Sequence, residues 1–241
     1  MYKSKKISLV LPAYNEEESV KKAIEEFQNI KIYDEIIIVD NNSNDSTANE
    51  IKATSATYVL ENEQGYGAAI RSGLSKTTGD IIVICEPDGS FVAKDTLRLC
   101  ELSEKYECVF GTRTSKEYIQ KGAKMGFLLR WGNIFVAYFL SILFLKDSKL
   151  FHTDVGCTYK LISRKIYNQI KNDLHVTKSE LQPEIMIRCI LTKCTIKEIP
   201  VIYKTRSGIS KITKNLLATT ILAIKMIFLI IKLRFMSLVK N

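Results

Sequence analysis

A pair of carboxylates follows an apolar run in the first half of the chain. The run Ile81–Cys85 is rich in β-branched residues and predicts a buried strand, and Glu86 and Asp88 come directly after it. Residues two apart on a strand point the same way, and Pro87 and Gly89 predict a turn here. Both side chains can therefore face one hard cation, and Mg²⁺ or Mn²⁺ is the kind of ion that carboxylates share with substrate phosphates. The alternative is a turn whose acids are solvated.

Two more polar segments follow predicted strands. Tyr14 and Glu16 come after the run Ile7–Leu11, and Asp40 comes after Glu35–Val39. Ligands of open α/β sheets bind beyond the carboxyl ends of the strands, so the three polar segments are expected to meet at one edge. There the tyrosine can stack on a base, and the acids can accept hydrogen bonds from a base or a ribose. Taken singly, each segment also fits a helix start or a turn.

Strand and helix signals alternate through the first half of the chain. This alternation predicts an α/β fold with a mostly parallel sheet and helices on both faces. The predicted strands are Ile7–Leu11, Glu35–Val39, Thr57–Leu60, Ile81–Cys85 and Cys108–Phe110, and the predicted helices are Glu16–Ile30, Ser46–Ala53 and Gly67–Lys76. Later in the chain, strand signals lie at Cys157–Ile162 and Cys194–Tyr203, and a helical pattern lies at Leu181–Leu191.

Two later segments are strongly apolar. Trp131–Leu145 has 15 residues, whereas a bilayer span needs roughly 20, so we expect a core helix or a helix at a membrane surface. The stretch from Lys214 to Val239 is helical in pattern, and Lys214, Lys225 and Lys232 project within about 20° of one another. Because a lysine in mid-bilayer costs roughly 2.5 kcal/mol or more, this helix is expected to lie in the interface. Docking on a soluble core is the alternative.

Composition narrows the range of partners. The chain has 241 residues and a net charge of +9, which suits an anionic partner such as an acidic membrane or a phosphorylated substrate. Nucleic acid is not expected as a partner, because the aromatic residues are not interleaved with the basic ones as stacking platforms would be. The six cysteines form no CxxC pair and are expected to be reduced in a cytosolic compartment. With two histidines, a His-based zinc site is not expected.

Four segments, in this order and spacing, resemble family-2 glycosyltransferases of the GT-A fold. They are Leu-Pro-Ala-Tyr-Asn-Glu-Glu (11–17), Val-Asp-Asn-Asn-Ser-Asn-Asp (39–45), Gly-Tyr-Gly-Ala-Ala-Ile-Arg (65–71) and Glu-Pro-Asp (86–88). Within that family the chain is most similar to the polyprenyl-phosphate sugar transferases. The segments that match those enzymes are Gly111 to Arg113, Arg130 to Asn133 with the apolar helix, Asp154 to Tyr159, and Arg206 to Lys211.

The resemblance implies an inverting transfer of a hexose from a nucleoside-diphosphate sugar to a polyprenyl (dolichyl or undecaprenyl) phosphate. GDP-mannose and UDP-glucose are the donors it favours. It implies a peripheral or monotopic protein at the cytosolic membrane face. The GT-A domain would span residues 1–212, with an interfacial apolar helix over 122–146, and a membrane-associated amphipathic helix would span 213–241.

The resemblance also assigns site residues. Contacts to the nucleotide sugar are expected from Pro12, Ala13, Tyr14, Glu16, Val39, Asp40, Asn42, Arg71, Glu86, Pro87 and Asp88. The metal ion, Mg²⁺ or Mn²⁺, is expected on Glu86 and Asp88. The lipid phosphate is expected on Arg113, Arg130, Arg206 and Lys211, and the catalytic set is Asp88, Arg113, Asp154, Arg206 and Lys211.

The match departs from the family at three positions. Glu86 stands where the family has Asp, Ser90 where mannose synthases have Gln, and Thr158 where the family has Gly. These departures leave the sugar nucleotide and the metal coordination open. A lipid phosphate is already an anionic nucleophile and needs no strong base, whereas a hydroxyl acceptor would need one, with Asp154 and then Glu184 as candidates. Transfer to a hydroxyl acceptor of a surface polysaccharide, or a membrane-associated module that binds nucleotide sugars without catalysis, are the alternative functions.

Overall fold

A seven-stranded sheet forms the centre of the molecule. The computed structural model describes residues 2–123, 126–148, 150–206 and 216–239. The strands are β1 (Ile7–Ala13), β2 (Glu35–Asp40), β3 (Thr57–Leu60), β4 (Ile81–Ile84), β5 (Cys108–Thr112), β6 (Lys160–Ser163) and β7 (Ile196–Pro200). Their order across the sheet is β3-β2-β1-β4-β6-β5-β7, and every pairing is parallel except those of β6 with β4 and β5. The prediction of a mostly parallel α/β sheet is confirmed.

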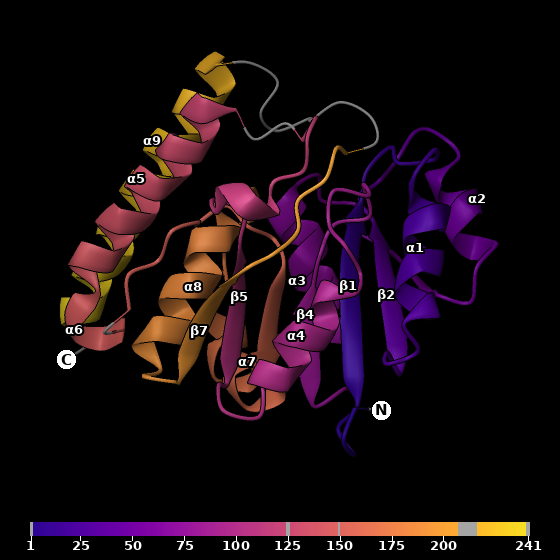
Figure 1. Cartoon of the computed structure of the whole chain (residues 1–241), viewed down its shortest axis with the longest axis horizontal. Helices are drawn as coiled ribbons and strands as arrows, with labels where there is room; N and C mark the ends of the chain where they lie inside the picture. Colours follow the sequence, from indigo (N-terminus) through magenta and orange to yellow (C-terminus); the bar gives the residue numbers. More distant parts are fainter. Residues whose placement is uncertain (1, 124–125, 149, 207–215, 240–241) are drawn as a thin grey trace.

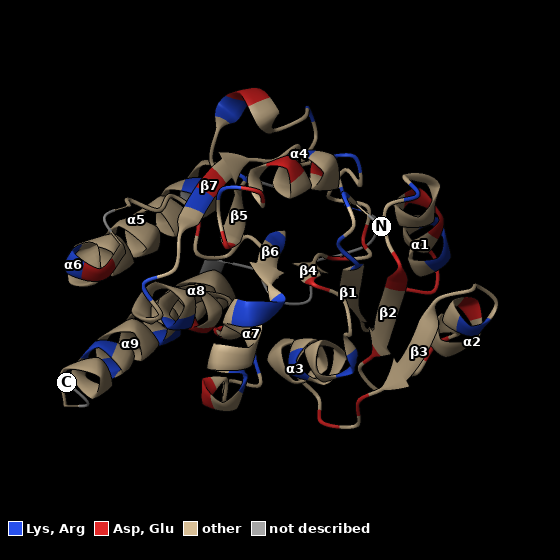
Figure 2. Cartoon of the chain, turned by 90° about the horizontal axis from the view of Figure 1, so that it is seen from below, with Lys and Arg blue, Asp and Glu red and all other residues tan. Residues whose placement is uncertain are grey.

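Helices cover both faces of this sheet (Figure 2). They are α1 (Val20–Asn29), α2 (Thr47–Lys52), α3 (Tyr66–Lys76), α4 (Asp95–Leu102), α5 (Phe127–Leu143), α6 (Leu145–Ser148), α7 (Arg164–Ile170), α8 (Leu181–Leu191) and α9 (Leu216–Val239). Alternate residues of each strand face opposite ways, so the sheet feeds two apolar cores. One core joins α1, α2 and α4, and the other joins α3, α5, α7, α8 and α9.

The first strand runs further than its proline predicts. The sequence pattern ends the strand before Pro12, but β1 continues to Ala13, and Pro12 pairs with Val39 of β2. On the other side, β4 pairs with β1 only as far as Val10. Pro12 therefore lies beyond the last β4 pair, where its missing N–H costs no ladder bond to that strand.

The two strongly apolar segments form a helix pair beside the sheet. In Figure 1, α5 and α9 lie side by side at one end of the molecule, and α9 also contacts α8. The buried residues Met226, Ile230 and Leu233 of α9 join the core that α3 and α8 share. An ion pair between Asp147 and Arg234, 2.9 Å long, ties α6 to α9. Within the described ranges, the structure contains no helix with the length and hydropathy of a bilayer span.

Candidate functional site

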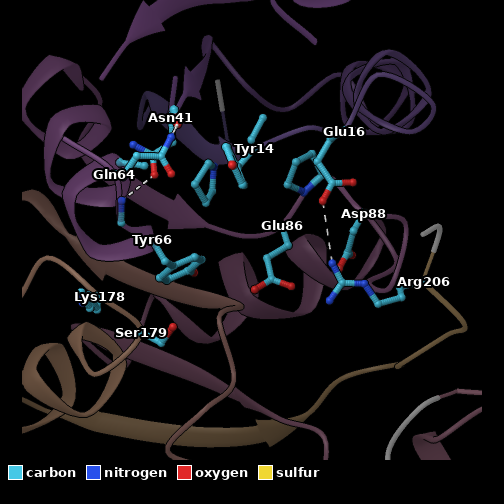
Figure 3. A pocket seen from close by; sticks show the side chains of 15 residues that line it. Tyr14, Glu16, Asn41, Gln64, Tyr66, Glu86, Asp88, Lys178, Ser179 and Arg206 are labelled. Carbon is cyan, nitrogen blue, oxygen red and sulfur yellow. Dashed lines mark hydrogen bonds and ion pairs between the residues drawn. The ribbon is translucent and has the colours of Figure 1, made fainter. Parts of the chain in front are cut away.

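A cavity of about 360 Å³ opens at the carboxyl ends of β1 and β4 (Figure 3). The segments after β1 and β4 line it with the residues expected there, and the segment after β2 contributes Asn41 and not Asp40, so the three segments meet at this edge. The cavity is lined by Pro12, Ala13, Tyr14, Glu16, Asn41, Gln64, Gly65, Tyr66, Ala69, Glu86, Pro87, Asp88, Lys178, Ser179 and Arg206.

Glu86 and Asp88 lie on one side of the cavity, directly after β4. The Asp88 side chain is almost fully buried, and its Oδ1 accepts a hydrogen bond of 2.9 Å from the amide of Ser90. Burial and, after it, the negative charge of Asp88 together raise the pKa of Glu86 to about 8, although the charges of Arg206 and Arg113 oppose this rise. Two ionised carboxylates this close together would repel each other, so a cation bound between Glu86 and Asp88 would be stabilised.

The donor set fits a divalent cation that a ligand helps to coordinate. Asp88 Oδ2 is buried, and among the described residues it has the Arg206 guanidinium as an ion-pair partner but no contact with hydrogen-bond geometry. Across those residues there is also no cluster of three or more His, Cys, Asp or Glu side chains that could enclose a metal ion. Glu86 and Asp88 could therefore hold Mg²⁺ or Mn²⁺ only with oxygen atoms from a ligand or water completing the shell. Such a site matches the preference of Mg²⁺ for a few carboxylates plus phosphate oxygens.

Arg206 brings positive charge to the same side of the cavity. Its Nη2 lies 3.1 Å from Asp88 Oδ2 and 3.8 Å from Glu16 Oε1 (Figure 3). It comes from the segment after β7, whereas Glu16 follows β1, so three separate parts of the sheet edge meet at this guanidinium. A guanidinium matches phosphate oxygens in a two-pronged geometry, so the same side chain can turn to an anionic ligand.

The Asn41 side chain holds together the side of the cavity opposite Glu86 and Asp88. Its Nδ2 donates to the carbonyls of Glu61 and Glu63, at 3.2 and 2.7 Å, and its Oδ1 accepts from the amide of Gly65 at 2.8 Å. Gln64 Nε2 donates in turn to the Asn41 carbonyl at 2.6 Å (Figure 3). This network fixes the 61–65 loop next to the end of β2, which leaves a polar surface facing Tyr14 across the cavity.

The glycines that begin α3 serve backbone packing. A Cβ on Gly65 would lie 2.1 Å from the Thr177 carbonyl oxygen, and one on Gly67 would lie 2.6 Å from that of Val176. The amide of Ala68 donates to the Thr177 carbonyl at 2.9 Å, so this amide at the helix start binds protein and not a phosphate. The close approach carries the 175–180 segment over the edge of the sheet.

Arg113 and Asp154 form a buried ion pair close to the cavity but outside its lining. Asp154 Oδ2 accepts from Arg113 N and Nε, at 3.0 and 2.9 Å, and Oδ1 accepts from Arg113 Nη2 at 2.9 Å and from the amide of Gly156 at 3.0 Å. Burial alone would raise the pKa of Asp154, but the charge and hydrogen bonds of Arg113 hold that pKa below its usual value. Both carboxylate oxygens are engaged.

Comparison with known proteins fits this architecture. Residues 8–170 match the family model described as glycosyl transferase family 2. The chain belongs to glycosyl transferase family 2. Over 108 residues it is 35% identical to an uncharacterized glycosyltransferase of Mycobacterium bovis, a match that covers 44% of this chain and only about half, 48%, of that relative.

Longer matches of this family-2 glycosyltransferase are more distant. It is 25% identical over 209 residues to a dolichyl-phosphate hexose transferase of Haloferax volcanii, with 86% of each chain covered. A crystal structure of glucosyl-3-phosphoglycerate synthase from Mycobacterium tuberculosis, in complex with Mn²⁺, UDP and glucosyl-3-phosphoglycerate, superposes with a TM-score of 0.69 at 19% identity, covering 94% of this chain and 80% of that one. That likeness shows the GT-A fold.

The structure places the expected site residues of this family-2 glycosyltransferase in three groups. The cavity brings together Pro12, Ala13, Tyr14, Glu16, Glu86, Pro87, Asp88 and Arg206. Arg113, Asp154 and Arg130 lie outside its lining, and Arg130 donates through Nε to the Thr114 carbonyl at 2.5 Å. Lys211 lies outside the described residues.

Four residues expected to bind the nucleotide sugar do not line the cavity. Val39 is fully buried in the core against α3, because its position in β2 points it into that face of the sheet. Asp40 is buried and accepts from the amide of Ser43 and from Tyr58 Oη. Asn42 occupies a turn with a positive φ of 59°. Arg71 lies on α3 in a separate cleft and donates to the His175 carbonyl at 3.3 Å.

Sequence reasoning did not assign Asn41, Gln64, Tyr66, Lys178 and Ser179, all of which line the cavity. The Asn and Gln side chains belong to segments that the sequence presents as turns. Lys178 and Ser179 are more than a hundred residues away from α3 in the chain, and the close backbone packing at Gly65 and Gly67 holds their segment against α3. The pair Gly65 and Gly67 at a helix start was the one signal of such a close approach.

Proposed function

We propose that this protein is an inverting hexosyltransferase that moves a sugar from a nucleoside-diphosphate donor to a polyprenyl phosphate at the cytosolic face of a membrane. The proposal rests on one observation above all: neither Asp154 nor Glu184, the two acids expected to activate a hydroxyl acceptor, is free to act as a base. The name of the Haloferax relative, which specifies a dolichyl-phosphate acceptor, supports the same acceptor class.

We infer the donor class from the two ends of the cavity, which offer different groups to a ligand. At one end Tyr14 offers its ring to a base, beside the loop that Asn41 and Gln64 hold in place, and at the other end Glu86 and Asp88 offer oxygens to a metal ion. A divalent cation bound there would neutralise the charge that builds on the diphosphate as its bond to the sugar breaks. Mn²⁺ and UDP in the related synthase complex support this use of the site, and UDP-glucose and GDP-mannose remain the donors we favour.

We infer the acceptor class from Asp154 and Glu184, whose carboxylates already accept hydrogen bonds from other groups of the protein. Asp154 accepts four hydrogen bonds, three of them from Arg113. Glu184 is almost fully buried, and its Oε2 accepts from the amides of His175 and Val176 at 3.0 and 2.9 Å. A hydroxyl group needs a base to become a nucleophile, but a phosphate carries its negative charge already. An anionic acceptor is therefore the one this site can use without a base.

Arg113 is the residue we assign to the acceptor phosphate, with Arg130, Arg206 and Lys211 as further contacts. Asp154 fixes the orientation of its guanidinium. A Cβ on Gly156 would lie 3.1 Å from Arg113 Nη2 and 2.8 Å from Asn133 Oδ1, so this glycine lets α5 approach the arginine. Arg113 thus lies where the cavity edge meets the apolar helix, a suitable place for the phosphate of an isoprenoid lipid.

The outer faces of α5 and α9 supply the membrane contact in this proposal. Large apolar side chains on α5, with exposed fractions between 48% and 78%, line the face opposite its buried residues: Phe127, Trp131, Phe135, Tyr138 and Ile142. On α9, Ile221, Ile224 and Phe228 are exposed about 160° around the helix from Met226. The exposed Lys225 and Lys232 lie together at one edge of that apolar arc, as headgroup-binding lysines of an interfacial helix do. Figure 2 shows basic residues along α9.

The test is to incubate the protein with Mn²⁺, a short polyprenyl phosphate and, in turn, radiolabelled UDP-glucose, UDP-N-acetylglucosamine and GDP-mannose. We expect one donor to give an organic-phase product that mild acid releases. The Asp88→Asn variant and a sample with EDTA should give none, and Glu63→Gln, an exposed acid outside the cavity, should match the parent. An alkali-stable glycoside on a hydroxyl acceptor, or donor binding without turnover of any pair, would contradict the proposal.

A further inference from the structure

Tyr66 and Gln182 form a hydrogen-bonded pair in the wall of the cavity. Gln182 Nε2 donates to Tyr66 Oη at 2.9 Å, which joins the first residue of α3 to the second residue of α8. Gln182 is almost fully buried, and its Oε1 has no hydrogen-bond partner among the described residues. The reverse amide orientation would leave both of its N–H donors unpaired, which is the costlier arrangement.

This pair leaves Tyr66 as a directed hydrogen-bond donor. The phenol oxygen already accepts from Gln182, so its own proton points to another acceptor. Burial raises the pKa of Tyr66 well above its usual value, and the nearby charge of Glu86 adds to the rise. The hydroxyl therefore keeps its proton throughout the physiological range and can donate it to a ligand oxygen.

The position of Tyr66 relative to the metal-binding carboxylates indicates which ligand oxygen that is. In Figure 3 the tyrosine ring lies beside Glu86, with Ser179 below it. In a nucleoside-diphosphate sugar the hexose is bonded to an oxygen of the terminal phosphate. A donor whose diphosphate binds beside Glu86 and Asp88 therefore places its hexose next to these carboxylates. Among the lining residues, Tyr66 lies next to that place, with Ser179 below it.

We propose that Tyr66, oriented by Gln182, donates a hydrogen bond to a hydroxyl of the donor hexose and so helps to determine which sugar is transferred. The inference rests on the proposed function and adds a sugar-specificity element to it. Its ligand class is a neutral hexose with an oxygen facing the phenol, while the ring itself offers an apolar surface to the C–H groups of the sugar. A sugar that lacks that oxygen would leave the phenol proton unpaired, which a buried site disfavours.

The test compares binding of a nucleotide with binding of its sugar conjugate. Affinities of the parent and of Tyr66→Phe are measured by calorimetry in Mn²⁺ for UDP, UDP-glucose, GDP and GDP-mannose. We expect Tyr66→Phe to bind the nucleoside diphosphate unchanged and the cognate nucleotide sugar about 3- to 10-fold more weakly, as loss of one hydrogen bond predicts. Gln182→Leu should shift affinity in the same direction. Tyr33→Phe, which removes a buried phenol bonded to Thr96 on the other face of the sheet, is the matched control.

Monodeoxy donors then identify the hydroxyl. The parent should lose affinity for the donor that lacks the recognised oxygen, and Tyr66→Phe should show no further loss with that donor. Equal weakening of UDP and UDP-sugar by Tyr66→Phe, or independent losses with every deoxy donor, would overturn this inference and leave the transferase proposal intact. A parent protein that binds none of the four probes would instead refute the proposed function itself.

Discussion

Arg113 and Asp154 are joined by three hydrogen bonds inside the protein, and the carboxylate is completely shielded from solvent. A carboxylate so engaged orients its partner and does not take up protons from a substrate. Its lowered pKa agrees with that role, because a general base that works near neutrality needs a higher one. The pair therefore links the stability of the fold to the orientation of the acceptor arginine.

Replacing Asp154 by Asn should lower both stability and acceptor affinity. The change leaves a buried guanidinium without its counter-charge, so the free energy of unfolding should fall by about 3–5 kcal/mol. KM for the polyprenyl phosphate should rise while KM for the donor stays constant. Denaturant unfolding and steady-state kinetics measure the two effects. Asp147→Asn, which breaks the more exposed pair with Arg234, should cost less than about 1 kcal/mol. A variant with unchanged KM and a loss confined to kcat, largest at the higher pH values where the parent carboxylate is ionised, would support a general base instead.

Gly65→Ala should displace the 175–180 segment. Because the new methyl group would lie 2.1 Å from the Thr177 carbonyl oxygen, backbone must move, and we expect a loss of about 1–3 kcal/mol in unfolding free energy with weaker donor binding. Gly132 in α5 is the control, because a Cβ there meets nothing within 4 Å. Gly132→Ala should stabilise the protein by about 0.5–1 kcal/mol. Thermal unfolding and donor titration check both, and a neutral Gly65→Ala would refute the packing role.

Lys160 should make stability depend on pH in the alkaline range. This lysine of β6 is fully buried, donates to the Cys157 carbonyl, and has a pKa lowered to about 8 by burial, against a usual value of 10.5. Between pH 8 and 10.5 the unfolded chain binds the proton that the folded chain has lost, so the free energy of unfolding should rise with pH, by on the order of 3 kcal/mol.

Urea unfolding from pH 7 to 11 measures this rise. Lys160→Met should lack it, whereas Lys197→Met, which changes an exposed lysine of β7, should keep it. Identical pH dependence in Lys160→Met and the parent would show that the buried amine does not titrate as expected. Subtracting the pH curve of each variant from that of the parent removes the contribution of the other groups that titrate in this range.

Phe135→Glu should weaken binding to lipid vesicles. The phenylalanine is 63% exposed in the middle of the apolar face of α5, and burying such a side chain contributes about 1.5–3 kcal/mol. We expect binding to vesicles of phosphatidylglycerol and phosphatidylcholine to fall by about 10- to 100-fold in a sedimentation assay. Leu97→Glu, an exposed apolar position on α4, should bind as the parent does. Equal losses in both variants would show that α5 is not the contact.

Local patterns predicted much of this fold because they record burial directly. The bounds of β3 and α8 are those that hydrophobic periodicity indicates. α4 and α7 were not predicted, since each is short and mixes polar residues with a narrow apolar stripe. The antiparallel direction of β6 also has no local signal, because it depends on which neighbours the strand finds.

The candidate site was likewise predictable from the sequence only in part. Glu86 and Asp88 follow a strand, and sequence alone places them at the sheet edge. Arg71 carries an equally plausible side chain but lies on α3 beside another cleft, a difference that only the orientation of the helix decides. Lys178 enters through a backbone contact between distant segments, which no local pattern records.

The contact between Arg206 and Asp88 has a consequence for the order of events at the site. In the absence of nucleotide, the Arg206 guanidinium lies 3.1 Å from Asp88 Oδ2, an oxygen that would also bind the divalent ion. The positive charges of the ion and the guanidinium would repel each other. A diphosphate arriving alone would meet the carboxylates. When both arrive, the phosphates balance the ion and offer the arginine a new partner. Ion and nucleotide should therefore bind with positive cooperativity, each tightening the other by the same factor.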